Sequence, residues 1–175
     1  FTHRPNLLYQ EVLSIFKKHE KYVPMTKSAF ILNFFRLYNI LWGVALPFLA
    51  KNKRLARGFE RRISSGHRQK ADIWIQAASA GEAYLAVQIL KCLSPSRPMK
   101  ILVTTLTEQG KEILENRIRE ITCHGNLNIC IDWFPFDRPD IIEGAVKKIQ
   151  PKAMVLLETE IWPALLWNLK QIGTR

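Results

Sequence analysis

From residue 71 onward, short apolar runs alternate with segments of helical spacing, and this alternation restricts the fold more than any other feature. The predicted strands are 73–78, 100–105, 127–134 and 153–157, and the predicted helices are 82–93, 108–120, 140–149 and 161–171. Strands that alternate with helices build βαβ units. The pattern therefore predicts an α/β domain with a parallel sheet flanked by helices and joined by right-handed crossovers.

Positive charge is concentrated before this domain. The chain has 175 residues and a formal net charge of +11. Residues 1–70 hold 14 Lys and Arg against three acids, whereas residues 71–175 hold 12 of each sign. A neutral domain lacks the electrostatic footprint of a nucleic-acid-binding protein, so we expect no nucleic-acid partner and interpret the basic segment as an attachment region.

Residues 28–50 predict an apolar helix that associates with a membrane. Its polar residues Asn33, Arg36 and Asn39 form a narrow stripe, and the uncharged run after Arg36 has 14 residues. A spanning helix needs about 20 apolar residues, so the pattern favours a helix in the membrane interface. The basic residues at 51–62 would add about 1 kcal/mol each near an anionic leaflet. A core-packing helix with a solvated basic face, or a nucleic-acid patch, remains an alternative.

The sequence thus divides into three regions. Residues 1–27 form a leader with no assignable role, residues 28–70 form the membrane-proximal segment, and residues 71–175 form the α/β domain. The chain starts at Phe1 and stops just after a helical pattern, so we expect both ends to be cuts from a longer protein. No cleavable signal pattern is visible.

Cysteine spacing and glycine motifs exclude several kinds of site. Cys92, Cys123 and Cys130 lack paired spacing, so neither a disulfide framework nor a metal site is predicted, and free thiols fit a reducing cytoplasm. Neither a dinucleotide fingerprint nor a phosphate-binding P-loop motif is present.

Polar residues gather where the predicted strands end. In a parallel sheet the carboxyl ends of the strands share one edge, and ligands bind there. Three of the four turns at this edge carry carboxylates, and the other carries Thr104, Thr105 and Thr107. The four turns are Ser79-Ala80-Gly81-Glu82, Thr104-Thr105-Leu106-Thr107-Glu108-Gln109-Gly110, Pro135-Phe136-Asp137-Arg138-Pro139 and Glu158-Thr159-Glu160-Ile161-Trp162-Pro163.

The first turn supports two interpretations. Ser79 and Glu82 have the spacing of a capping box, in which each side chain bonds the other's backbone N–H. Glu82 also lies in the turn that follows the predicted first strand, so its carboxylate would be presented at the edge where a substrate binds. The two roles are compatible, because capping would help to fix where Glu82 points. Thr107 and Asp137 are likewise suited to capping.

These four turns, in this order, resemble the N-terminal domain of bacterial 3-deoxy-D-manno-octulosonic acid (Kdo) transferases. The shared patterns are S-x-G-E, T-T-x-T-x-x-G, P-x-D-x-P and E-T-E-[IL]-W-P. The resemblance covers residues 30–175 and includes the basic membrane-proximal start. One such motif is weak, but four in order at strand-to-helix turns are specific.

The resemblance implies an inverting glycosyltransferase of the GT-B type, with two Rossmann-like domains, at the cytoplasmic face of the bacterial inner membrane. The N-terminal domain would bind a lipid A precursor as acceptor, and a C-terminal domain absent from this chain would bind the donor CMP-Kdo. The expected general base is Glu82, and no metal or other cofactor is expected. The other site residues implied are Ser79, Gly81, Thr104, Thr105, Thr107, Asp137, Glu158 and Glu160.

Two alternatives accompany this reading. One is a related GT-B transferase that acts on another lipid-linked acceptor. The other is a non-catalytic, membrane-tethered binding module. Whether the enzyme is a Kdo transferase or a related GT-B transferase, we expect residues 1–175 to be inactive alone, because they lack the donor-binding domain.

Overall fold

A computed structural model describes residues 25–52, 57–64, 66–121, 126–158 and 160–175. Most of the predicted leader lies outside these ranges, as do part of the basic cluster and the loop at 122–125. The chain divides into two units between Leu37 and Tyr38. The following description concerns the unit that begins at Tyr38, except where α2 is described along its own length.

The sheet has four parallel strands, which confirms the predicted α/β fold. The strands are β1 (Ile73–Ala77), β2 (Met99–Thr105), β3 (Leu127–Trp133) and β4 (Ala153–Leu156), in the order β3-β2-β1-β4. β1 lies in the middle, with Ile75 opposite Val103 of β2 and Val155 of β4. Each strand lies within one residue of its predicted bounds.

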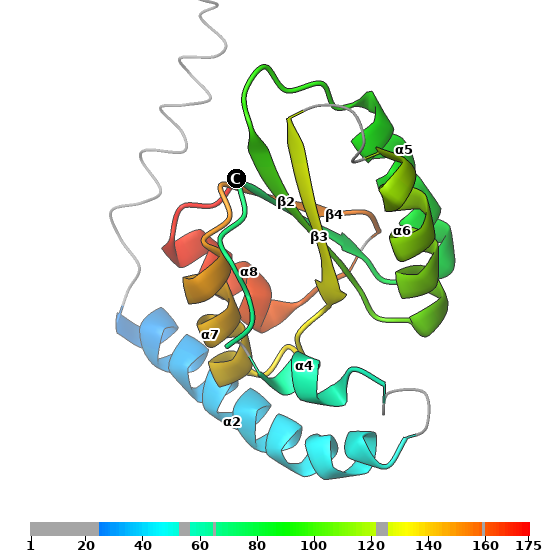
Figure 1. The fold of residues 1–175 in the computed structure, drawn as a ribbon. Helices are drawn as coiled ribbons and strands as arrows, with labels where there is room; N and C mark the ends of the chain where they lie inside the picture. Colours follow the sequence, from blue (N-terminus) through cyan, green and yellow to red (C-terminus); the bar gives the residue numbers. More distant parts are fainter. Residues whose placement is uncertain (1–24, 53–56, 65, 122–125, 159) are drawn as a thin grey trace, which may run out of the picture. The chain divides into compact units, whose positions relative to one another are not determined.

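Helices cover the two faces of the sheet unequally. The helices α5 (Ala80–Cys92) and α6 (Glu108–Ile121) lie side by side on one face, and α7 (Pro139–Ile149) and α8 (Pro163–Gln171) lie on the other (Figure 1). The core between the sheet and the first pair is built from alternate strand residues such as Ile75 and Val103, with Val87, Leu90 and Leu114 from the helices. Alternate residues share this core because successive side chains of a strand point to opposite faces of the sheet.

The opposite face of β2 and β3 is polar. Successive strand residues point to opposite sides, so Leu127, Ile129 and Ile131 face the first core, whereas Asn128 and Cys130 on the other side are exposed. Residues 67–71, which lie between α4 (Phe59–Ile63) and β1, line a pocket on this face together with strand residues.

The helix predicted at 28–50 is present as α2 (Met25–Ala50). By length and composition, Ala29–Ala50 is apolar enough to cross a membrane, whereas sequence reasoning favoured an interfacial helix because of Arg36. From Tyr38 onward, however, one side of α2 is held by the α/β domain. The Tyr38 hydroxyl donates to Asp137 over 2.9 Å, and the Trp42 and Phe136 rings lie 5.7 Å apart.

The other side of this part of α2 is apolar and exposed. Ile40, Leu41, Val44 and Phe48 are 57–71% exposed. Their spacing places them along one face of the helix, away from the side that carries Tyr38 and Trp42. A helix whose polar contacts face its own domain and whose apolar face is exposed has the reverse of the usual surface-helix arrangement.

Candidate active site

Two of the four predicted turns flank the point where the chain reverses direction across the sheet. From β1 the chain proceeds to β2 and β3 on one side, and then crosses to β4 on the other side of β1. In open α/β sheets, ligands bind outside the carboxyl ends of the strands at such a switch point. The turn at Ser79–Glu82 follows β1, and the turn at 157–163 follows β4. This region is the candidate active site.

Two backbone hydrogen bonds and one contact between aromatic rings join the four turns along one edge. The Phe134 N–H donates to the Thr105 carbonyl over 3.0 Å, which links the second and third turns. The Phe134 and Trp162 rings lie 5.0 Å apart, which links the third and fourth. The Leu157 N–H donates to the Gln76 carbonyl over 3.3 Å, which links the fourth turn to β1.

Glu82 is buried, with 2% of its surface exposed, and forms the predicted capping box with Ser79. Its Oε1 accepts from the Ser79 N–H (3.1 Å) and the Ser79 hydroxyl (2.7 Å), and its Oε2 accepts from the Ala78 N–H (2.7 Å). The Glu82 N–H donates to Ser79 Oγ over 3.3 Å. The capping role is therefore confirmed, and the role of general base stays a prediction. Glu82 is the third residue of α5, so the helix starts two residues earlier than predicted.

The three threonines of the second turn have different environments. Thr104 is fully buried, where it accepts from Trp74 Nε1 (2.8 Å) and donates to Gln76 Oε1 (2.6 Å). Thr105 is also buried, whereas Thr107 is exposed and its hydroxyl accepts from the Gly110 N–H over 3.1 Å. Thr107 therefore makes an N-terminal capping contact for α6, and its role toward a substrate stays a prediction.

Gly110 sets the distance between the first two turns. A Cβ added there would lie 2.5 Å from Thr105 Oγ1, 2.9 Å from Thr107 Oγ1 and 3.3 Å from the Ser79 carbonyl oxygen. Only a residue without a side chain allows α6 to start this close to the Ser79 turn.

We expect Gly110→Ala to lower the free energy of unfolding by about 1–3 kcal/mol, because the added carbon is overpacked against backbone and short side chains. Urea denaturation measures this loss. Gly81→Ala is the matched control, since its Cβ would meet only Ser79 Oγ at 3.8 Å and an alanine favours the helix. Equal urea midpoints for the two variants would contradict the close approach at Gly110.

Asp137 is fully buried and caps α8 from a distance in sequence. Its carboxylate accepts from the N–H groups of Ala164 (3.0 Å) and Leu165 (2.8 Å) and from the Tyr38 hydroxyl. Burial raises the pKa of Asp137, and these hydrogen bonds oppose the rise. The predicted cap is present, but the helix that it caps is α8 and not α7. Its substrate-binding role stays a prediction, although both oxygens are occupied by protein donors.

In the fourth turn, Glu158 is exposed and Glu160 is half-buried. Glu160 Oε2 accepts from Trp162 Nε1 over 2.9 Å, and the Glu160 N–H donates to the Glu158 carbonyl over 2.8 Å. The helix α8 starts at Pro163 rather than at residue 161, because proline suits the first helical position. The exposed Glu158 carboxylate is thus the one available to a ligand.

A buried arginine supports this edge, and sequence reasoning did not identify it. Arg62 of α4 is 0% exposed and donates to the carbonyls of Leu106 (2.6 Å) and Phe134 (3.3 Å). Its guanidinium lies 4.5 Å from the centre of the Trp133 ring. Burial lowers the pKa of Arg62 to about 10. Through these hydrogen bonds, Arg62 links the backbone of the second turn to the start of the third.

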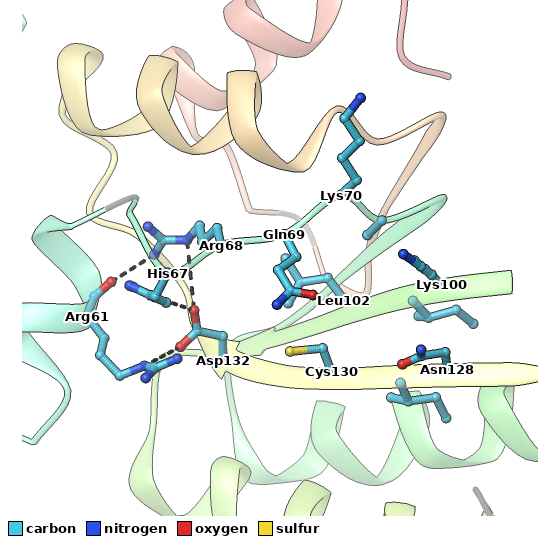
Figure 2. Close-up of a pocket in the computed structure, with 13 residues that line it drawn as sticks. Arg61, His67, Arg68, Gln69, Lys70, Lys100, Leu102, Asn128, Cys130 and Asp132 are labelled. Atoms are coloured by element: carbon cyan, nitrogen blue, oxygen red, sulfur yellow. Dashed lines mark hydrogen bonds and ion pairs between the residues drawn. The ribbon is translucent and has the colours of Figure 1, made fainter.

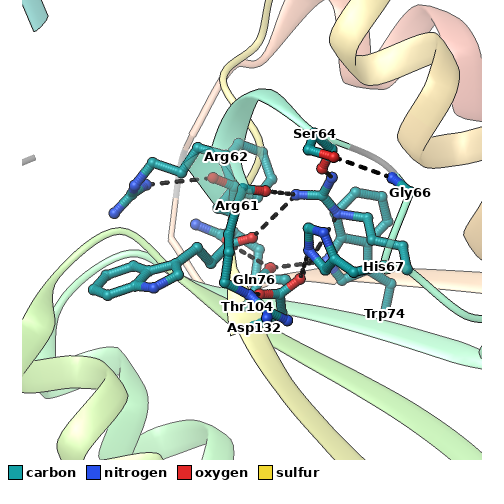
Figure 3. A network of polar contacts seen from close by, with 12 residues as sticks. Arg61, Arg62, Ser64, Gly66, His67, Trp74, Gln76, Thr104 and Asp132 are labelled. Atoms are coloured by element: carbon teal, nitrogen blue, oxygen red, sulfur yellow. Dashed lines mark hydrogen bonds and ion pairs between the residues drawn. The ribbon is translucent and has the colours of Figure 1, made fainter. Parts of the chain in front are cut away.

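A second polar cluster surrounds Asp132 (Figure 3). The buried Asp132 carboxylate accepts from Arg61 Nε over 2.9 Å, and its other oxygen lies 2.8 Å from His67 Nε2. Arg68 Nε lies 3.9 Å from the same oxygen.

The alternation Asn128, Cys130, Asp132 within β3 was a visible sequence signal for a polar strand face. The basic partners were not identifiable, because they lie more than 60 residues away.

Comparison with known proteins identifies the family. The family model described as 3-deoxy-D-manno-octulosonic-acid transferase (kdotransferase) matches residues 53–175. Since this match covers well over half of the chain, the chain belongs to the Kdo transferase family, as the four motifs predicted. No solved structure matches the chain.

Individual relatives agree with the family. A Haemophilus influenzae 3-deoxy-D-manno-octulosonic acid transferase is 33% identical over 98 residues, covering 55% of this chain and 21% of the relative. A Rickettsia bellii protein of the same name is 29% identical over 143 residues, covering 75% of this chain and 32% of the relative. A Fusobacterium nucleatum bifunctional glycosyltransferase/methyltransferase is 29% identical over 149 residues, covering 79% of this chain and 22% of the relative. The chain therefore spans about a fifth to a third of the length of these relatives.

Proposed function

We propose that the protein containing this chain is a glycosyltransferase that moves Kdo from CMP-Kdo to a lipid A precursor. Residues 71–175 would form its acceptor-binding half. Family membership and the names of the relatives support this proposal. The observation that carries it is the position of the Ser79–Glu82 turn beside the switch point of the sheet, where α/β proteins bind ligands.

In this proposal Glu82 is the general base. Inversion by a single displacement requires a group that takes the proton from the acceptor hydroxyl as CMP leaves. An ionised carboxylate offers about four lone-pair positions. Ser79 donors occupy two on Oε1, and the Ala78 N–H occupies one on Oε2. One position on Oε2 has no protein donor, and in this proposal the acceptor hydroxyl takes it when the acceptor displaces the groups that leave Glu82 only 2% exposed.

The remaining site residues divide by exposure. Gly81, Thr107 and Glu158 are exposed, and Ser79 is partly so. We assign direct contacts with the acceptor to these groups. Thr104, Thr105 and Asp137 are buried, so in this proposal they support the turns, and Glu160 orients Trp162.

The donor CMP-Kdo would be held mainly by a domain outside this chain. The proposal includes no metal or other cofactor. The reaction would take place at the cytoplasmic face of the inner membrane, where a lipid-linked acceptor can be presented to the sheet edge. The apolar face of α2 supports membrane attachment.

We propose that this face of α2, defined by Ile40, Leu41, Val44 and Phe48, lies in the membrane interface. The opposite side of the same segment is occupied by contacts of Tyr38 and Trp42 with the domain. A segment held in this way fits a helix that lies on the membrane with its apolar face buried in the headgroup region.

Ile40→Lys with Val44→Lys is expected to weaken binding to vesicles that contain phosphatidylglycerol at least about tenfold, since each side chain contributes about 1.5–3 kcal/mol of apolar burial. Vesicle co-sedimentation of the full-length protein measures the effect. The matched control is Leu85→Lys with Ile89→Lys on α5, which are also exposed and similarly spaced. Unchanged binding of the α2 variant would refute the anchor. Deleting residues 28–70 is less informative, because it removes Tyr38 and Arg62 from the domain.

The proposed activity is tested by incubating the full-length protein with CMP-Kdo and a tetra-acylated lipid A precursor. We expect a product heavier by one or more Kdo residues, detected by mass spectrometry, with release of CMP. CMP release only with a different lipid-linked acceptor would favour the related-transferase alternative. Failure to consume CMP-Kdo with any acceptor would favour a non-catalytic binding module.

A further inference from the structure

The polar face of β2 and β3 carries a basic pocket that the proposed active site does not use (Figure 2). Its volume is about 300 Å³, at the lower end of the range for small-molecule sites. It is distinct from the four turns at the carboxyl edge, because none of the residues that line it belongs to those turns. The polar side chains that line it are Arg61, His67, Arg68, Gln69, Lys70, Lys100, Asn128 and Asp132.

Positive charge dominates this pocket. Four cations, from Arg61, Arg68, Lys70 and Lys100, line the pocket, against a single carboxylate, that of Asp132. Both oxygens of that carboxylate are already occupied by Arg61 and His67. The pocket therefore retains a strong excess of positive charge in a concave site, where electrostatic attraction is less screened than on an open surface.

One of these cations is desolvated and incompletely paired. Arg68 is 6% exposed, and burial lowers the pKa of its guanidinium. Its two terminal nitrogens donate to backbone carbonyls of Ser64, Arg61 and Trp133, whereas its buried Nε has no hydrogen-bond acceptor. A buried cation without full compensation is costly, and a nearby anion reduces that cost.

The other three cations lie at opposite ends of the pocket, with Arg61 beside Asp132 and the two lysines at the end that carries Asn128 (Figure 2). Arg61 is bound to Asp132 through Nε, which leaves its two terminal nitrogens available as a fork. The ammonium groups of Lys70 and Lys100 form no ion pair with any residue that the structure describes. Two mobile ammonium groups at one end of a basic pocket suit a phosphate group better than a carboxylate, because phosphate has more oxygens and more charge.

We propose that this pocket binds a phosphate-bearing ligand. Lys70 and Lys100 contact the phosphate, and the side-chain amides of Gln69 and Asn128 hydrogen-bond the group attached to it. Arg61 and Arg68 add positive charge from the other end of the pocket. The phosphate can belong to a soluble ester or to a lipid headgroup, and the experiments below separate the two sources.

Cys130 provides a local reporter, because its exposed thiol lines the pocket, whereas the exposed Cys92 on α5 lies outside it. The full-length protein is alkylated with iodoacetamide with and without glycerol phosphate, and the two peptides are quantified by mass spectrometry. We expect saturating glycerol phosphate to slow alkylation of Cys130 at least about threefold and to leave Cys92 unchanged. Equal rates at Cys130 with and without the probe would overturn the proposal for soluble phosphate esters.

The charge-reversal variant Lys70→Glu with Lys100→Glu tests the pocket directly. Both side chains are exposed, so the fold does not depend on them, and the matched control is Lys91→Glu with Lys170→Glu. The assays are glycerol phosphate protection of Cys130 and co-sedimentation with phosphatidylglycerol vesicles, with phosphatidylcholine vesicles as reference. If the pocket variant, and not the control, binds glycerol phosphate at least tenfold more weakly, the ligand is a soluble phosphate ester. If the pocket variant, and not the control, binds phosphatidylglycerol vesicles at least tenfold more weakly, the ligand is a lipid headgroup. If the pocket and control variants match in both assays, the proposal fails.

Discussion

Replacing Glu82 by glutamine in the full-length protein is expected to lower kcat by about 10²- to 10⁴-fold, the contribution of a positioned general base. The amide cannot accept a proton from the acceptor hydroxyl, although its shape is nearly that of the carboxylate. Transfer of Kdo from CMP-Kdo under saturating substrates is the measurement. Turnover within about threefold of the wild type would remove Glu82 from the base role.

The same substitution also disturbs the cap, and the two effects must be separated. The Glu82 carboxylate accepts three hydrogen bonds, and a glutamine would direct its NH₂ group at one of those donors. We therefore expect a loss of about 1–3 kcal/mol in the free energy of unfolding. Val87→Ala is a suitable control, because it weakens α5 through its buried face by a similar amount and leaves the cap intact. Near-normal kcat in this control assigns the loss in Glu82→Gln to chemistry.

Asp137→Ala is expected to lower the free energy of unfolding by about 3–5 kcal/mol. The substitution leaves the buried N–H groups of Ala164 and Leu165 without an acceptor, at about 1–3 kcal/mol each, and also removes the acceptor of the Tyr38 hydroxyl. Urea denaturation of the full-length protein measures the loss. Asp140→Ala is the control, since this neighbouring carboxylate is exposed and pairs only with Arg138. Its removal is expected to cost at most about 1 kcal/mol. A loss below 1 kcal/mol for Asp137→Ala would contradict the capping role.

Asp137 also predicts a pH dependence. Burial raises its pKa in the folded protein above the unfolded value of about 3.9, so the folded state holds this proton more tightly. The stability contributed by protonation is complete below the unfolded pKa and is lost as the pH rises through the folded pKa. The stability advantage of the wild type over Asp137→Asn should therefore shrink as the pH rises from about 4. A constant difference across that range would contradict the raised pKa.

The strands and helices of the α/β domain were predictable because their periodicities are regular. The start of α5 was misplaced by two residues, although the Ser79–Glu82 capping box itself indicated that Glu82 is the third helical residue. The placement of the site at one sheet edge followed from the parallel order of the strands.

The supporting residues were harder to predict. Arg61 and Arg62 are adjacent in a basic run, yet the first is exposed and the second is fully buried. A helix as short as α4 has no periodicity that could distinguish them. The helix that Asp137 caps could not be predicted either. A carboxylate at a predicted helix start is expected to cap that helix, whereas Asp137 accepts from Ala164, which lies 27 residues later.

One consequence follows from the Asp137 carboxylate, which is shared by α2 and the first turn of α8. A membrane that favours one orientation of the Tyr38 side chain also changes the free energy of the turn that precedes α8, where Glu158 and Trp162 flank the switch point. Thermodynamic reciprocity then requires that a ligand which stabilises this turn changes the affinity of the helix for lipid by the same factor. If α2 attaches to a membrane and this edge binds the acceptor, as proposed, the Tyr38–Asp137 hydrogen bond couples the two equilibria.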